Sequence, residues 1–265
     1  HLVAGEEYDP GAINRIIAEQ KITLINCTPS AFYPLVEQAE QSGYQELKSL
    51  REVFLGGEAI LLARLRHWLQ SEACHSEIVN TYGPTECTDV CAFYRLDRHS
   101  MDAYSYVPLG RPIDNVGLVA VDEHSQLCPI GVIGELCIAG DGVGAGYVND
   151  AELTREKFVA NPFKELSGET IYKTGDLVRY LSDGTLEYLG RRDHQVKIRG
   201  HRIELGEIEE VLGQHAAIQQ AVVVAREDTP GDRRLVAYVA TSPGGSTSAS
   251  ELRSYLQQKL PEYMV

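Results

Sequence analysis

The segments Tyr172-Lys173-Thr174-Gly175-Asp176 and 190–209 (GRRDHQVKIRGHRIELGEIE) decide how this chain is organised. Glycine recurs through the second segment between arginine and lysine, in a chain whose formal net charge is −14. Glycines between cations indicate a backbone that approaches an anionic ligand closely. Three β-branched residues alternate with charged ones here, which predicts a strand or hairpin that buries them: Val196, Ile198 and Ile203.

Length and composition describe an ordinary globular protein. The 265 residues suffice for two domains or one large one, and 43% are hydrophobic and 23% charged. The net charge of −14 argues against binding to nucleic acid or to anionic membranes. No apolar run approaches the roughly 18 residues of a membrane span, and the start, His1-Leu2-Val3, has no signal-peptide pattern.

The cysteines are scattered rather than grouped in metal-binding pairs. Cys87 and Cys91 have no matching second pair, so we do not expect a zinc site there. In a large acidic chain without an export signal, such thiols predict a cytoplasmic protein with reduced cysteines. The full set is Cys27, Cys74, Cys87, Cys91, Cys128 and Cys137.

The first third of the chain alternates helix and strand, which predicts a parallel α/β layer. Helices are expected at 10–21, 31–42 and 59–70, and strands at 22–25, 53–55 and 78–80. In such a layer ligands bind at the carboxyl ends of the strands. The loops at those ends are 26–30, 56–58 and 80–86.

After residue 105 the pattern changes to short β segments separated by turns, which predicts an antiparallel sheet or small barrel. The segments are 116–121, 133–139, 176–181 and 185–189, with a hairpin turn at Asp183-Gly184. A small α+β unit follows residue 193. It has predicted helices at 204–215 and 251–259, strands at 218–226 and 234–240, and a flexible loop at 242–248.

Two motifs carry residue types suited to nucleotide chemistry. The hydroxyl of Thr85 beside the carboxylate of Glu86 can hold Mg²⁺ and phosphate oxygens, and Tyr82 can stack on a base. Asp176 can accept both hydroxyls of a ribose. The alternatives are a plain β-turn at 82–85 and an aspartate that only caps a turn. The glycines of 140–146 lack the Lys-Ser/Thr of a phosphate loop and predict a tight β-turn.

Four motifs in one order resemble the adenylation domains of nonribosomal peptide synthetases, within the adenylate-forming superfamily that includes acyl- and aryl-CoA ligases. They are 80–86 (NTYGPTE), 134–138 (GELCI), 172–176 (YKTGD) and 190–209. The resemblance covers essentially all 265 residues. It implies that 1–193 is the C-terminal part of an adenylation core, a parallel α/β layer with a small β-barrel. Residues 194–265 would be the small, mobile α+β C-terminal subdomain, incomplete at its end.

The resemblance also implies an activity. Such domains use ATP and Mg²⁺ to convert an amino acid into an aminoacyl-adenylate, and then load it onto the phosphopantetheine thiol of a peptidyl carrier protein. Neighbouring synthetase domains and a small MbtH-like activator protein are the other partners implied. We expect residues near 100–110 to be where such a partner docks. Other adenylate-forming ligases, acting on an aryl acid, on D-alanine or on an acyl group, stay open, as does a non-catalytic docking fragment.

Matching the motifs residue by residue implies roles. Thr85 would approach the α-phosphate, Glu86 would bind Mg²⁺, and Asp176 the ribose. Arg191 would assist at the ribose and phosphate, Asp193 would be the hinge, and Lys197 would enter the site for thiolation. The remaining nucleotide-site residues would be Gly57, Glu58, Ala59, Asn80, Tyr82, Gly83 and Tyr188.

The matched substrate pocket is Asn26, Phe54, Gly56, Thr81, Asp89 and Val90. A carboxylate in a small pocket needs a partner, so Asp89 suggests a cationic or polar amino acid such as arginine, lysine or ornithine. The alternative is that Asp89 bonds only to protein groups.

The chain departs from the family pattern in four places. It lacks the phosphate loop, the Phe-Asp motif that holds the substrate amino group, and the terminal Asn-Gly-Lys motif, and it has Ala145 where an arginine is usual. We therefore expect a fragment of a longer domain that adenylates poorly by itself.

Overall fold

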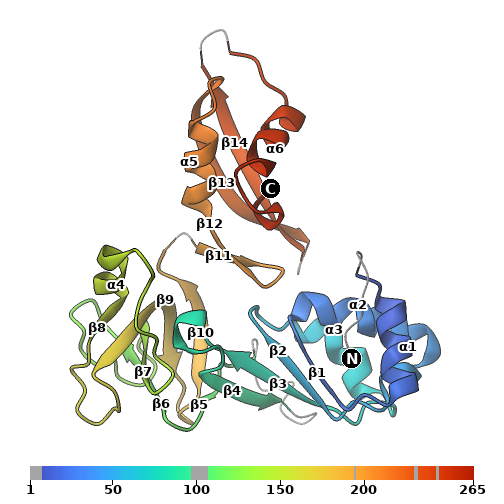
Figure 1. Cartoon of the computed structure of the whole chain (residues 1–265). Coiled ribbons are helices and arrows are strands. Elements are labelled where there is room, and N and C mark those ends of the chain that lie inside the picture. The colour runs from blue at the N-terminus through green and yellow to red at the C-terminus, as the bar shows by residue number, and fades with distance from the viewer. Residues whose placement is uncertain (1–7, 97–106, 194, 230–231, 243–244) are drawn as a thin grey trace. The chain divides into compact units, whose positions relative to one another are not determined.

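The computed structural model describes residues 8–96, 107–193, 195–229, 232–242 and 245–265 (Figure 1). It divides into two compact units, residues 1–192 and residues 193–265. The first unit contains two sheets and the second contains two separate hairpins with two α-helices.

The N-terminal part of the first unit is a five-stranded sheet in the order β1-β2-β3-β4-β5. Strands β1 (Leu24–Cys27), β2 (Glu52–Gly56) and β3 (Glu77–Tyr82) are parallel, whereas β4 (Ala92–Leu96) and β5 (Arg111–Pro112) are antiparallel. Three helices accompany the parallel strands: α1 (Pro10–Gln20), α2 (Pro29–Ala39) and α3 (Leu62–Gln70). The predicted alternation of helix and strand is confirmed.

Local sequence explains where the first helices begin. The Asp9 carboxylate accepts hydrogen bonds from the first-turn amides of α1, and the Thr28 hydroxyl caps α2 in the same way. A proline follows each cap, because the missing N–H is not needed in the first turn. The helices pack on the sheet around Trp68, whose ring meets Phe32 edge-on at 5.3 Å between centroids.

The second sheet of this unit is antiparallel, in the order β10-β9-β7-β6, with β8 paired to β9. The strands are β6 (Val116–Val121), β7 (Gly134–Gly140), β8 (Phe158–Ala160), β9 (Thr170–Tyr180) and β10 (Leu186–Arg191), and helix α4 (Ala151–Lys157) precedes β8. The expected hairpin turn between β9 and β10 is present, because Gly184 has φ +81° and the Leu181 N–H donates to the Thr185 carbonyl. β9 begins six residues before the predicted 176, so the 172–176 motif lies inside a strand.

In the second unit, β11 (Gln195–Ile198) and β12 (His201–Glu204) form the hairpin predicted from the β-branched residues. Its turn uses left-handed conformations at Arg199 and Gly200, and Ile203 is fully buried. Helix α5 (Leu205–Gly213), the pair β13 (Ile218–Thr229) and β14 (Asp232–Thr241), and helix α6 (Ala249–Gln257) follow. Short 3₁₀ helices lie at Glu40–Ser42, Gln45–Leu47, Thr85–Cys87 and Glu262–Met264.

None of the six cysteines, all of which lie in the described residues, forms a disulfide. Within the described ranges, the helices are too short or too polar to cross a membrane.

Candidate functional site

The carboxyl ends of the three parallel strands bring most of the predicted substrate pocket together. Asn26 on β1 is in register with Phe54 on β2, and Gly56 on β2 is in register with Thr81 on β3. Neighbouring strands lie about 4.8 Å apart, so these residues form one continuous edge. A Cβ at position 56 would lie 2.4 Å from the Thr81 hydroxyl oxygen, so glycine is required for the strands to approach there.

The loop after β3 returns to the end of that strand. The Cys91 N–H donates to the Tyr82 carbonyl at 2.7 Å, and a Cβ at position 83 would lie only 1.6 Å from the Asp89 carbonyl oxygen. Thr88 and Asp89 both adopt left-handed backbone conformations, with φ of +61° and +71°. The loop therefore folds against Gly83, and Asp89 is exposed to solvent.

A buried cluster links the two sheets of the first unit. The Tyr82 hydroxyl at the end of β3 donates to Asp176 Oδ2 on β9, 94 residues further along the chain. Arg191 Nη1 on β10 lies 2.6 Å from Asp176 Oδ1, and the two side chains are only 7% and 4% exposed. Burial, and then the neighbouring Asp176 charge, raise the pKa of Tyr82 well above its ordinary value, so the phenol is a donor.

An irregularity in β9 holds Asp176 in place. Gly175 has φ +76°, and the register of β9 against β7 shifts at this point. The Thr174 hydroxyl donates to the Leu136 carbonyl at 2.8 Å and accepts from the Asp176 N–H at 2.9 Å. Arg191 Nη2 also donates to the Thr174 carbonyl at 3.0 Å. Thr174 is thus a supporting residue that the motif contained but that sequence reasoning did not assign.

Glu135 supports the same bulge from β7. Its carboxylate accepts the Gly175 N–H at 3.1 Å and lies 3.5 Å from Arg192 Nη1. The Arg192 N–H donates to the Gly175 carbonyl at 2.9 Å. These contacts fix the end of the first unit immediately before Asp193, the predicted hinge. Sequence reasoning assigns Glu135 no role beyond its place in a matching motif.

Glu86 belongs to a second cluster of hydrogen-bonded side chains, which includes Tyr172 on β9. The Tyr147 hydroxyl donates to Glu86 Oε1 at 2.7 Å and lies 3.3 Å from the Tyr172 hydroxyl. The Gly144 N–H donates to the Glu86 carbonyl at 2.8 Å. Burial, followed by the hydrogen bonds to its two neighbours, raises the pKa of Tyr147. Thr85, next to Glu86, is exposed. β9 therefore holds Tyr82 directly through Asp176, and it is linked to Glu86 through the Tyr147 hydroxyl.

The other predicted nucleotide-site residues have mixed surroundings. Gly57 is left-handed at φ +82°, and a Glu58 oxygen accepts the Ser30 N–H at 3.1 Å. The buried Asn80 amide donates to the Pro108 carbonyl at 2.7 Å. Ala59 is exposed, and Tyr188 is half-buried on β10, in register with Val178.

Two predicted residues belong to the second unit. Lys197 is half-buried on β11 and in register with Arg202 on β12. Asp193 Oδ1 accepts the Gln195 N–H at 3.2 Å, so the hinge candidate also starts the hairpin.

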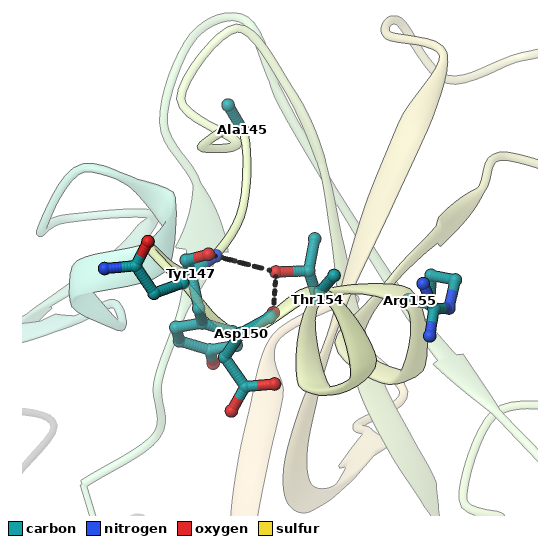
Figure 2. A pocket seen from close by; sticks show the side chains of 7 residues that line it. Ala145, Tyr147, Asp150, Thr154 and Arg155 are labelled. Carbon is teal, nitrogen blue, oxygen red and sulfur yellow. Dashed lines mark hydrogen bonds between the residues drawn. The ribbon is translucent and has the colours of Figure 1, made fainter.

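The glycine-rich loop after β7 forms the expected turn, because the Val143 N–H donates to the Gly140 carbonyl at 3.2 Å. Beyond the turn lies an open pocket of about 490 Å³ at the start of α4 (Figure 2). It is lined by Ala145, Tyr147, Asn149, Asp150, Ala151, Thr154 and Arg155. The predicted docking segment near 100–110 lies largely outside the described residues, which omit 97–106.

Comparison with known proteins identifies the class. The profile of AMP-binding enzymes matches residues 1–148, and that of the AMP-binding enzyme C-terminal domain matches residues 207–265. The chain therefore belongs to the AMP-binding enzyme family, as the motifs predicted.

Particular relatives point to peptide synthetases. The chain is 47% identical over 257 residues to tyrocidine synthase 3 of Brevibacillus parabrevis, a match covering 97% of this chain. It resembles NpsA-ThdA, an artificially fused adenylation–PCP di-domain from Klebsiella oxytoca, with 31% identity over 97% of this chain and a TM-score of 0.81. It also resembles the Vibrio cholerae adenylation domain AlmE, solved in complex with glycyl-adenosine-5'-phosphate, with 30% identity over 96% of this chain and a TM-score of 0.80.

The fold is accordingly that of adenylate-forming adenylation domains, as predicted. The chain spans 4% of the length of tyrocidine synthase 3, and 49% and 47% of the two solved chains.

Proposed function

We propose that this chain contributes to ATP-dependent activation of an amino acid, as part of nonribosomal peptide synthesis. The observation that carries the proposal is the Tyr82–Asp176–Arg191 cluster. It joins a strand-end loop of the α/β sheet to the antiparallel sheet, beside the predicted substrate edge. A buried acid held by a phenol and a guanidinium suits recognition of a ribose, because its carboxylate is already oriented before a ligand binds.

The proposed first reaction is adenylation. An oxygen of the amino-acid carboxylate forms a bond to the α-phosphorus of ATP. The bond from that phosphorus to the oxygen bridging to the β-phosphate breaks, and pyrophosphate leaves. Positioning and charge neutralisation supply the catalysis of such a phosphoryl transfer. Asp176 would orient the ribose, Tyr82 and Asn80 the adenine, and Arg191 and Thr85 the phosphate side.

The proposed second reaction is thioester formation. The phosphopantetheine thiol of a carrier protein attacks the acyl carbon, the acyl–phosphate bond breaks, and AMP leaves while the thiol proton passes to solvent. Lys197, on the second unit, would act in this step. Asp193 would be the hinge about which the second unit moves between the adenylation reaction and the thioester reaction. Relatives named as synthetases and as adenylation–PCP proteins support a carrier protein and neighbouring synthetase domains as partners. An MbtH-like activator is a further proposed partner.

Glu86 is the residue that would hold Mg²⁺. Magnesium prefers carboxylate oxygens and is commonly bound by one or two carboxylates together with substrate phosphates. A single half-buried glutamate fits that pattern. Among the residues that the structure describes, no group of three or more potential ligands forms a metal cluster. When bound, the cation would neutralise the developing charge on the phosphates.

The substrate proposal rests on Asp89. Its backbone folds against Gly83, two residues after Thr81 of the predicted pocket, and we propose that its carboxylate recognises a cationic or strongly polar side chain. An aryl-acid, D-alanine or acyl ligase is the nearest alternative, because these enzymes share the nucleotide site.

ATP–pyrophosphate exchange in the natural-length protein that carries these 265 residues tests the function. We expect exchange with arginine, lysine or ornithine and loss of exchange in Asp176→Ala. Exchange supported by benzoate-type or fatty acids but by no amino acid would favour the alternative ligases. Calorimetric ATP binding without any exchange would favour a non-catalytic docking role.

A further inference from the structure

We propose that Tyr147 is a positioning residue that holds the Glu86 carboxylate in the orientation in which it receives the divalent cation. The inference rests on the proposed function, because it takes Glu86 as the cation ligand. Tyr147 lies 61 residues from Glu86 in the chain, in the loop between β7 and α4, and no sequence motif connects the two.

The first argument is the contact itself. The Tyr147 hydroxyl donates to Glu86 Oε1 at 2.7 Å, the distance of a strong hydrogen bond to an ionised group. One phenol engages only one of the roughly four acceptor positions of a carboxylate. The bond therefore restricts the rotation of the carboxylate and itself takes up only one of these positions. Donors of this kind behind a metal ligand commonly control metal affinity.

The second argument is that Tyr147 is itself held from several sides. Its ring meets Phe158 edge-on, with centroids 5.5 Å apart. Its N–H donates to the Thr154 hydroxyl oxygen at 2.9 Å, and that hydroxyl donates to the Asp150 carbonyl at 2.7 Å. The first turn of α4 therefore holds the backbone of Tyr147 in place (Figure 2). The phenol oxygen thus has a defined position before any ligand arrives.

The third argument is that the whole loop is built against Glu86. The Gly144 N–H donates to the Glu86 carbonyl, so the loop holds the glutamate at its backbone as well as at its side chain. Gly146 has φ +132°, and a Cβ there would lie 2.4 Å from the Thr154 methyl carbon. A side chain at 146 would therefore push Tyr147 away from its partner. These residues form one support for Glu86: Gly144, Gly146, Tyr147 and Thr154.

The test compares Tyr147→Phe with Tyr180→Phe in the natural-length protein. Tyr147→Phe removes the hydroxyl and retains the ring contact with Phe158. Tyr180→Phe is the matched control, because its hydroxyl donates at 2.6 Å to the Leu118 carbonyl in the same sheet and does not contact Glu86. The direct readout is Mn²⁺ binding, by electron paramagnetic resonance, in the presence of a non-hydrolysable ATP analogue.

We expect Tyr147→Phe to weaken Mn²⁺ binding by roughly 10-fold, the low end for loss of a group that supports a metal ligand. In the exchange assay the Mg²⁺ concentration for half-maximal rate should rise by a similar factor, with the KM for the amino acid unchanged. Saturating Mg²⁺ should restore the rate, which it would not do for a variant that is merely misfolded. Thr154→Val, which keeps the phenol but removes its backbone anchor, should show a smaller loss in the same direction.

Unchanged Mn²⁺ affinity in Tyr147→Phe would overturn this inference but not the proposed function, provided that the wild-type protein binds the analogue with Mn²⁺. An equal loss in Tyr180→Phe would also overturn it, because the effect would then be general to the sheet. A wild-type protein that binds neither nucleotide nor cation would overturn the proposed function and this inference with it.

Discussion

Replacing Arg191 by methionine should strongly destabilise the first unit, because it leaves the buried Asp176 carboxylate without its cation. The two side chains are 7% and 4% exposed, so water cannot take over the role of the guanidinium. Removing one partner of a buried pair typically costs about 3–5 kcal/mol. For a unit of this size each kcal/mol lowers Tm by about 2–4 °C, which gives a decrease of roughly 6–20 °C.

The double variant D176N/R191M separates this explanation from simple loss of packing. The asparagine is neutral and can still accept a hydrogen bond from the Tyr82 hydroxyl, so no unpaired charge is left. It should therefore be more stable than Arg191→Met alone, although it carries one more substitution. Replacing a whole buried ion pair by neutral groups often costs little.

The assay is urea unfolding followed by tryptophan fluorescence. Trp68 is the only tryptophan in the chain and is fully buried in the first unit, so its emission reports on that unit. If the double variant is less stable than Arg191→Met, by an amount equal to the separate cost of Asp176→Asn, the charge explanation is refuted. The cluster would then act through packing alone.

Three further predictions follow from particular contacts. Gly83→Ala should largely unfold the first unit in the same urea assay, since its Cβ would lie 1.6 Å from a backbone oxygen. Gly206→Ala lies in α5 of the second unit with open space around it, and it should stabilise that unit by about 0.5–1 kcal/mol, measured by urea unfolding of residues 193–265 followed by circular dichroism. Burial raises the pKa of Tyr33 to about 12, so the unfolded chain loses this proton first and stability should fall between pH 10 and 12; Tyr33→Phe should flatten that slope in pH-dependent unfolding. Asp89→Ala should reduce exchange with a cationic amino acid by up to about 5-fold, since an exposed charge pair contributes at most about 1 kcal/mol, and an unchanged substrate profile would rule the role out.

Much of the fold was predictable because its signals are local. The caps at Asp9 and Thr28 each precede a proline, and Asp183-Gly184 marks a tight turn, so these boundaries can be read from a few neighbouring residues. Boundaries moved where tertiary contacts extend an element. β9 starts at Thr170 rather than at 176, because it pairs with both β7 and β8 before the bulge at Gly175.

The site was only partly predictable, because its contacts join distant segments. Asp176 and Tyr82 were singled out separately, but their hydrogen bond spans 94 residues and has no local signal. Tyr147 and Thr174 were not assigned roles, because tyrosine and threonine are common residues both in the core and on the surface of β-rich segments. The left-handed turn at Thr88 and Asp89, which exposes the Asp89 side chain, also depends on the close approach to Gly83 and not on a turn motif.

Amino-acid-dependent ATP–pyrophosphate exchange by the natural-length protein, with mass-spectrometric detection of the adenylate, tests the central claim most directly. We predict exchange and an aminoacyl-adenylate with a cationic or polar amino acid, both abolished in Asp176→Ala. An adenylate formed only from an aryl or fatty acid, or exchange that persists fully in Asp176→Ala, would contradict the account.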